Sequence, residues 1–274
     1  MPLTMEPKYE EQFTAFVDFL GFSEAATTID ETTRSKVLDL LLSLSTLRGE
    51  FDLQSTVQES GKKISFKPAI STFSDHIVIS YPLQPICADT GSDERIGGIF
   101  IMNHFTNLLT RIAAAALRIG FLVRGGATIG KLYHAQGVVF GEALIDAFQI
   151  ESRTAIYPRV VLSSQITSRP MWIQNRSGKF AKDHDGLYHF DYFRELLFYT
   201  AQSGENWFEA AKLWFDDVTA VINRNLTELE SSGRMNEFAK WAWFARQFRR
   251  ALETLKPEFL KSVGVSLDAI SWPQ

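Results

Sequence analysis

The chain has 274 residues, 45% of them hydrophobic, which is enough to bury a sizeable core and excludes an intrinsically disordered protein. A formal net charge of −4 argues against nucleic acid held by a broad basic surface, so small molecules or proteins are the expected partners. Its one cysteine, Cys87, can form no intrachain disulfide, and without a basic leader or an apolar run of about 18 residues we expect a cytoplasmic protein with no membrane segment.

The first part of the chain alternates between strand and helix patterns. An apolar, aromatic run predicts a strand over 12–20 that ends at Gly21. Leucines at helical spacing then predict a helix over 27–47. Two stretches of alternating polarity, 63–73 and 75–81, predict an antiparallel pair of strands.

The middle of the chain continues this alternation. A long helix with one apolar face is expected over 96–118. The elements expected after it are a strand over 121–129, a hairpin over 131–136, a strand over 137–140, a helix over 142–152 and a strand over 157–162. This order predicts an α+β fold with a mainly antiparallel sheet and helices on one face.

Two further helices are expected near the C-terminus, over 206–229 and 236–255, and both are rich in aromatic residues. Aromatic residues at helical spacing favour a hairpin packed on the core over a separate binding module. The sequence thus divides into an expected α+β domain over 8–165 and a C-terminal extension over 166–274.

Two aspartates lie at the ends of predicted strands. Asp18 precedes a glycine break that would expose backbone amides at the start of a helix, which favours an anion. Asp75 lies at the turn between the two middle strands. If the first strand lies beside that pair, both carboxylates meet at one sheet edge and can share divalent cations. An aspartate at a strand end is more often a turn former, so the residues alone leave both interpretations open.

Four segments, taken in order, resemble the class III nucleotidyl cyclases. They are "FVDFLGFS", "FSDHIVI", "RGGATIG" and "GEALIDAFQIES", and the similarity covers roughly residues 10–163. The resemblance implies a ferredoxin-like catalytic core that works as a homodimer with shared active sites between protomers. It also implies two divalent ions in each site, Mg²⁺ or Mn²⁺.

The resemblance gives roles to individual residues. Asp18 and Asp75 would hold the metal ions, and Phe19 would add its backbone carbonyl. The residues whose backbone amides would bind the substrate phosphates are Gly21, Phe22 and Ser23.

Two departures from the family pattern bear on the substrate. Purine cyclases read the base with polar or charged side chains at positions that here hold Ser71 and Val138, and neither residue can supply that contact. The bacterial pyrimidine cyclases of the Pycsar antiphage system have a similar pattern, including "FGEALIDAFQIES" and "YPRVVLS" here. This closer resemblance implies conversion of UTP or CTP to a 3′,5′-cyclic monophosphate and pyrophosphate, a second messenger for a separate effector protein.

Other positions depart from the catalytic pattern. The family's transition-state asparagine and arginine fall at Ile145 and Gln149, which cannot replace them. The cations that can substitute are Arg124, Lys131, His134 and Arg153. Arg124 is equally compatible with a surface charge at a strand edge, and the two hairpin residues are more often solvated.

His76 is expected to point to the strand face opposite Asp75 and to be structural.

The lost asparagine and arginine are also compatible with a different class of protein. In that interpretation the chain is a catalytically inactive, cyclase-like module that binds a nucleotide, or a dimeric scaffold.

Overall fold

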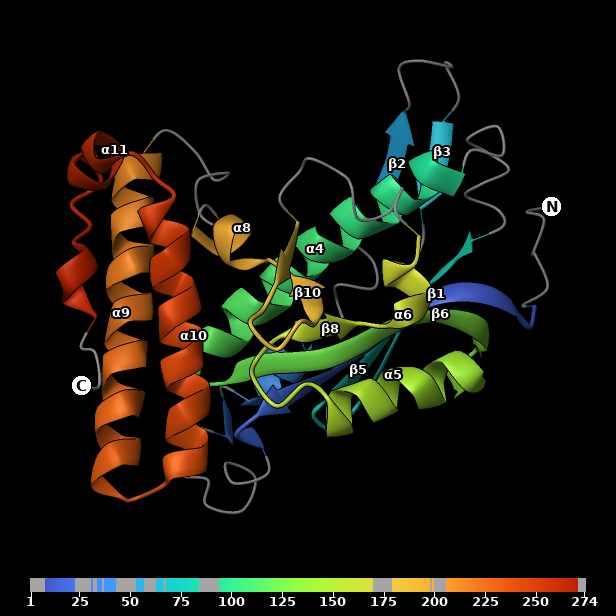
Figure 1. The fold of residues 1–274 in the computed structure, drawn as a ribbon, viewed down its shortest axis with the longest axis horizontal. Coiled ribbons are helices and arrows are strands. Elements are labelled where there is room, and N and C mark those ends of the chain that lie inside the picture. The colour runs from blue at the N-terminus through green and yellow to red at the C-terminus, as the bar shows by residue number, and fades with distance from the viewer. Residues whose placement is uncertain are drawn as a thin grey trace.

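The computed structural model describes residues 8–22, 31, 34–35, 37–42, 53–56, 63–66, 68–83, 94–169, 179–197, 199 and 206–270. A mixed sheet forms its centre (Figure 1). The strands in spatial order are β4 (Ala69–Phe73), β5 (His76–Pro82), β1 (Glu10–Leu20), β6 (Leu122–Ala135), β8 (Val160–Leu162), β10 (Tyr188–Phe190) and β9 (Phe180–Lys182). Neighbouring strands are antiparallel except β6 and β8, which are parallel.

The sheet confirms an α+β fold with mainly antiparallel pairing. Strands β4, β5, β1 and β6 have the spatial order of a ferredoxin-like β-α-β-β-α-β unit. A second, two-stranded sheet consists of β2 (Leu53–Thr56) and β3 (Lys63–Phe66), so the stretch predicted as one strand over 63–73 is two strands. Of the helix predicted over 27–47, the described residues 31, 34–35 and 37–42 are helical, and the others lie outside the described part of the chain.

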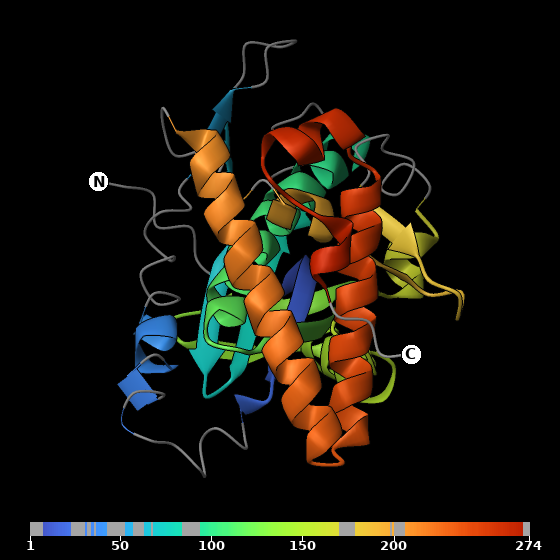
Figure 2. The same ribbon diagram turned by 90° about the vertical axis from the view of Figure 1, so that its left-hand side faces the viewer.

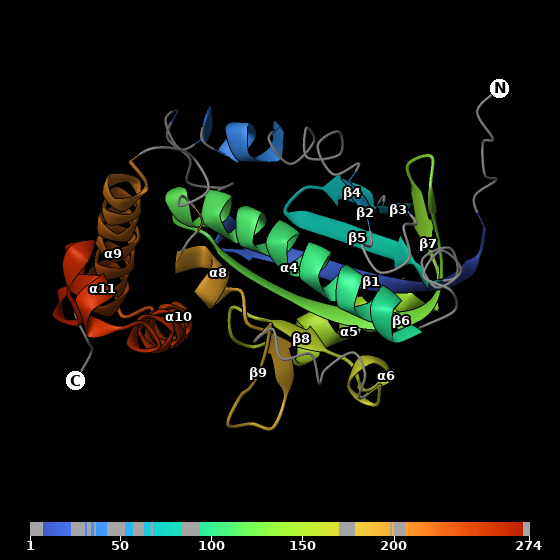
Figure 3. The same ribbon diagram turned by 90° about the horizontal axis from the view of Figure 1, so that it is seen from above.

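One face of the sheet carries the main hydrophobic core. The odd-numbered residues of β1 from 13 to 19 point to this face and are almost fully buried: Phe13, Ala15, Val17 and Phe19. Helix α4 (Glu94–Arg118) covers it, with the Phe105 ring 5.1 Å from that of Phe13 (Figure 3). Burial of these rings is the main stabilising contribution expected at this layer.

Helix α5 (Glu142–Arg153) covers the opposite face, so the expectation of helices on one face only is wrong (Figure 3). Glycines on β6 allow the close approach. A Cβ atom on Gly126 would lie 2.3 Å from the carbonyl oxygen of Ala147 and 2.6 Å from Cβ of Ile150. The absence of a side chain at Gly126 therefore allows α5 to pack this close to the sheet.

The hairpin after β6 differs from its prediction. Strand β6 continues through Ala135 instead of ending at 129, and it pairs with β7 (Val138–Phe140). The turn falls at Gln136 and Gly137, which have positive φ values of 52° and 80°. Lys131 therefore lies within a strand and not in a loop.

The C-terminal part contributes to the same sheet. No element was predicted between 165 and 190, but this stretch includes β9 and β10, and β10 pairs with β8. The helices of this part are α6 (Ser164–Thr167), α8 (Phe193–Leu197), α9 (Trp207–Ser231), α10 (Met235–Glu253), α11 (Pro257–Ser262) and a 3₁₀ helix (Leu267–Ala269). Helices α9 and α10 lie side by side at one end of the molecule (Figure 2). Their first and last residues are within two positions of those predicted for the two helices.

A buried arginine joins the β9–β10 hairpin to α10. The Arg159 side chain is 1% exposed and donates to the carboxylates of Asp183, at 2.6 Å, and Asp185. The indole Nε1 of Trp243 donates to the same Asp183 carboxylate at 3.1 Å. Burial opposes ionisation of Asp183, but the His184 amide, the Arg159 charge and the Trp243 hydrogen bond outweigh it and lower its pKa.

No helix in the described ranges is both long enough and apolar enough to cross a bilayer.

Candidate metal centre

The register of the central strands places charged side chains in one row. Asp18, near the end of β1, pairs with His76 at the start of β5 and with Arg124 on β6. Residues directly opposite one another in antiparallel strands point to the same face. All three side chains therefore lie on the face that α5 covers.

Asp75 joins this row from the adjoining turn. The chain reverses between β4 and β5 at Ser74, which has a positive φ of 55°. Asp18, Asp75 and His76 each offer one ligand atom, and these atoms lie within 4.8 Å of one another. The Asp18 and Asp75 side chains are only 9% and 13% exposed. The predicted convergence of the two aspartates is therefore present.

His76 lies on a different face from the one expected. Its Nδ1 is 3.1 Å from the Asp75 carboxylate, and its Nε2 is 3.8 Å from Oδ1 of Asp18. The expectation applied strand alternation across Asp75, but Asp75 belongs to a turn, where alternation does not hold. His76 is thus a third possible ligand beside the two aspartates.

Arg124 contacts the cluster from β6. Its Nε and Nη2 atoms donate to Oδ2 of Asp18 at 3.2 and 3.0 Å. Nη2 also lies 2.6 Å from the Glu151 carboxylate of α5. Arg124 is therefore engaged within the site, and its side chain is only 24% exposed, which rules out the interpretation as a surface charge.

Glu151 was missed by the sequence reasoning. Glu151 is only 3% exposed, although glutamate is rarely buried unless it is paired. A signal was available, because Ala143, Ala147 and Glu151 recur every four residues and so lie on one face of α5. A charged residue on that apolar face indicates a buried partner, which here is Arg124.

The cluster carries an excess of negative charge. Asp18, Asp75 and Glu151 supply three carboxylates against the single guanidinium of Arg124. Burial raises the pKa of Asp18 and of Glu151, while the Arg124 charge opposes this rise in both. Buried carboxylates with raised pKa values favour a bound cation. Two carboxylates and an imidazole are a donor set that fits a divalent ion.

Residues with expected phosphate and metal contacts lie close to this row. Gly21 follows β1 directly and has a positive φ of 98°. The Phe22 ring packs at 6.0 Å from Phe121. The Phe19 side chain points to the opposite, buried face, and its backbone pairs with Val123. Ser23 lies outside the described residues.

The two positions expected to read the base differ from each other in contacts and exposure. The Ser71 hydroxyl is 2.9 Å from Nε2 of His134, whose Nδ1 is 2.9 Å from the Ser80 hydroxyl. His134 is therefore part of the sheet face and not a solvated hairpin residue. Val138 lies on β7 and is 51% exposed.

No protein-family model matches the sequence, and no curated protein matches it. Among solved structures, the chain is similar to a bacterial light-regulated adenylyl cyclase, with 12% sequence identity and a TM-score of 0.38. That similarity covers 68% of this chain and 92% of the other.

An aromatic border adjoins the carboxylates. Phe73 stacks on His76 with ring centroids 5.5 Å apart, and Phe16 contacts Phe73 and Phe148. Phe16 is buried, but Phe73 and Phe148 are about half exposed. Other exposed apolar residues on β7 and α5 are Val138, Phe140 and Ile145.

Proposed function

We propose that this protein is a nucleotidyl cyclase that uses divalent cations and acts on a pyrimidine nucleoside triphosphate. The observation that supports this most is that Asp18 and Asp75, the two side chains that the sequence resemblance assigns to metal, meet together with His76, with ligand atoms within 4.8 Å of one another. The reaction would convert UTP or CTP to the 3′,5′-cyclic monophosphate and pyrophosphate.

The two carboxylate oxygens of Asp18 would have different partners. Oδ2 of Asp18 accepts both hydrogen bonds from Arg124, and Oδ1 is the atom that lies 3.8 Å from Nε2 of His76. Arg124, braced by Glu151, would fix the rotamer of Asp18 and so act as a positioning residue. Divalent cations, when bound, lower the pKa of a hydroxyl nucleophile and offset charge on the reacting phosphate.

The phosphates and the base would contact different parts of the sheet. The backbone amides of Gly21, Phe22 and Ser23 would bind the phosphate chain, which the left-handed Gly21 supports by turning the backbone after β1. The linked Ser71 and His134 side chains can donate and accept hydrogen bonds, which suits the edge of a small base.

Dimerisation is part of the proposal. Exposed apolar residues border the metal cluster, as expected of a surface that a second copy covers. Phe148 and Ile145 on α5 are 47% and 57% exposed. A homodimer with shared active sites would bury them and bring new groups to the Asp18 face. The product would act as a second messenger for a separate effector in antiphage defence, which the sequence resemblance alone supports.

Turnover tests this proposal directly. Purified protein is incubated with UTP, CTP, ATP or GTP and Mn²⁺, and products are identified by mass spectrometry. We expect a cyclic pyrimidine monophosphate from wild type and none from Asp75→Ala. Asp217→Ala, an exposed carboxylate on α9, should retain wild-type turnover. Failure of all four nucleotides to react would refute the enzymatic proposal.

The alternative is an inactive module that binds a nucleotide. It is favoured by Ile145, which stands exposed where the family has its transition-state asparagine. Metal-dependent binding of UTP or CTP without turnover would support this alternative.

A further inference from the structure

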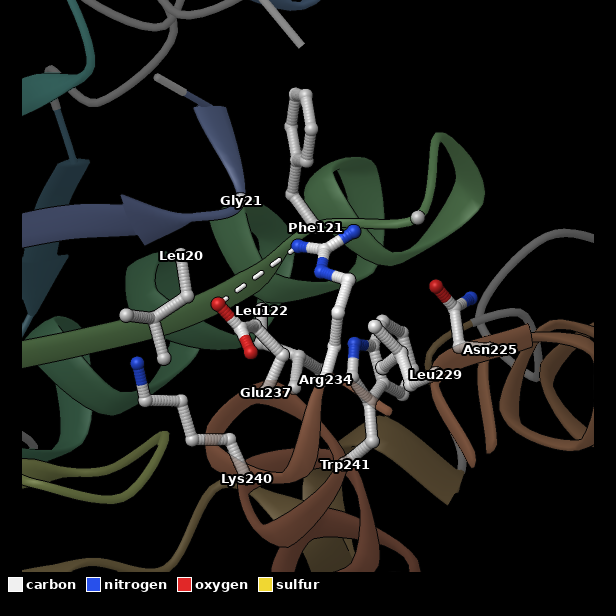
Figure 4. A pocket seen from close by; sticks show the side chains of 11 residues that line it. Leu20, Gly21, Phe121, Leu122, Asn225, Leu229, Arg234, Glu237, Lys240 and Trp241 are labelled. Atoms are coloured by element: carbon white, nitrogen blue, oxygen red, sulfur yellow. Dashed lines mark ion pairs between the residues drawn. The ribbon is translucent and has the colours of Figure 1, made fainter. Parts of the chain in front are cut away.

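A cavity lies between the end of β1 and the C-terminal helices. Its volume is about 230 Å³, and it is lined by the β1 end at Leu20 and Gly21, the start of β6, and residues of α9 and α10 (Figure 4). The proposed cyclase reaction uses none of its side chains. Its walls combine two segments that are far apart in sequence, so a ligand here would contact both the sheet and the helical pair.

The cavity has an apolar wall. Leu20, Phe121 and Leu122 come from the sheet, and Leu229 and Trp241 come from the helices. Trp241 and Leu229 are only 6% and 7% exposed. A flat indole beside aliphatic side chains suits an aromatic or aliphatic ring.

The rim of the cavity carries an uncompensated positive charge. Arg234 and Glu237 form an ion pair at 3.8 Å, drawn as the dashed line in Figure 4. Within the described ranges, Lys240 forms no hydrogen bond or ion pair, and its side chain is partly buried. Figure 4 shows the Lys240 amino group on the side of the cavity nearest Leu20. An acidic group on a ligand would supply the partner that Lys240 lacks.

We propose that this cavity binds a small amphipathic anion, a molecule of one or two rings with a single acidic group. The ring would lie against Trp241 and Leu229, and the acidic group would pair with Lys240. Drug-sized ligands occupy cavities of about 300 to 1,000 Å³, so a cavity of about 230 Å³ suits a smaller molecule. Because Gly21 lines the cavity and lies three residues after Asp18, the ligand would also restrain the segment that leaves the metal cluster.

Two probes of matched ring structure test the proposal. Binding of 1-naphthalenesulfonate and of uncharged 1-naphthalenemethanol to the full chain is measured by ligand-observed saturation-transfer NMR. We expect the sulfonate to bind wild type about fivefold more tightly than the alcohol, the size of one partly exposed ion pair. Lys240→Gln should abolish this preference, and Lys261→Gln, on exposed α11, should preserve it.

A second variant tests whether the ring of the probe binds inside the cavity. Asn225 also lines the cavity and is partly exposed, so Asn225→Phe fills the space with little risk to folding. Binding of both probes should then be lost, while the thermal unfolding midpoint stays near that of wild type. Unchanged binding of the probes to Asn225→Phe, or an unchanged preference in Lys240→Gln, would overturn the proposal. The test is independent of nucleotide turnover.

Discussion

Acidification should destabilise the fold through His104, which is 8% exposed on α4. A 2.7 Å hydrogen bond joins its Nδ1 to the Tyr81 hydroxyl of β5. Burial penalises the charged imidazolium and lowers the pKa of His104 from 6.5 to about 4. On acidification the unfolded chain therefore binds this proton well before the folded chain does.

The size of the effect follows from that difference. The stabilisation is complete above pH 6.5 and is lost as the pH falls toward the folded-state pKa of about 4. The contribution of His104 to the free energy of unfolding should fall by about 2 kcal/mol between pH 7 and pH 5, and by about 3 kcal/mol between pH 7 and pH 4.

Urea unfolding across this pH range measures the contribution. His104→Gln keeps a neutral side chain that can hydrogen-bond to Tyr81, so it should lose about 2 kcal/mol less than wild type between pH 7 and pH 5. Asn107→Gln, at an exposed site on the same helix, should follow the wild-type profile. If His104→Gln and wild type have parallel profiles, the reasoning about the buried imidazole is refuted.

Three further substitutions test packing and assembly. Arg159→Met leaves the Asp183 carboxylate buried without its cation, and should lower the free energy of unfolding by about 3 to 5 kcal/mol in urea titrations. Gly126→Ala places a methyl group 2.3 Å from the Ala147 carbonyl oxygen, so α5 must move and stability should fall by about 3 kcal/mol. Phe148→Glu puts a charge on the proposed dimer surface, and should shift sedimentation velocity profiles toward monomer.

The glycine substitution and the dimer-surface substitution each have a matched control. The new methyl group of Gly130→Ala would lie 3.3 Å from its nearest neighbour, so this variant should lose clearly less free energy of unfolding than Gly126→Ala. Leu213→Glu alters an apolar residue on α9 that is 60% exposed, and should leave the oligomeric state unchanged. An equal loss of stability in the two glycine variants would contradict the account of how α5 packs on the sheet. Wild-type stability of Arg159→Met would contradict the role of the buried ion pair, and dissociation by Leu213→Glu would contradict the position of the dimer surface.

Local patterns were sufficient for much of the fold. The apolar runs of β1 and α4 and the aromatic spacing of α9 and α10 predicted those elements because side-chain periodicity reflects burial directly. Strands β9 and β10 were not predicted, because each has three residues and neither forms the continuous apolar run that marked the equally short β7 and β8. Their position depends on the contacts of Arg159, which no local pattern reveals.

The candidate site was predictable only in part. Their positions at predicted strand ends and the resemblance both drew attention to Asp18 and Asp75, but neither carried information on register. The contacts of His76 and Arg124 follow from register, because both residues pair directly with Asp18. Glu151 reaches the site only because Gly126 lets α5 come close to the sheet. Long-range packing of this kind is not encoded in spacing along one segment.

Direct binding of Mn²⁺ tests the central claim most closely. A titration followed by electron paramagnetic resonance, with UTP present, compares wild type with Asp75→Asn and with Asp217→Asn, a substitution at an exposed position of α9. We expect wild type and Asp217→Asn to bind Mn²⁺ and Asp75→Asn to lose that binding. Equal Mn²⁺ binding by Asp75→Asn and wild type would contradict the assignment of the Asp18, Asp75 and His76 cluster as a metal centre.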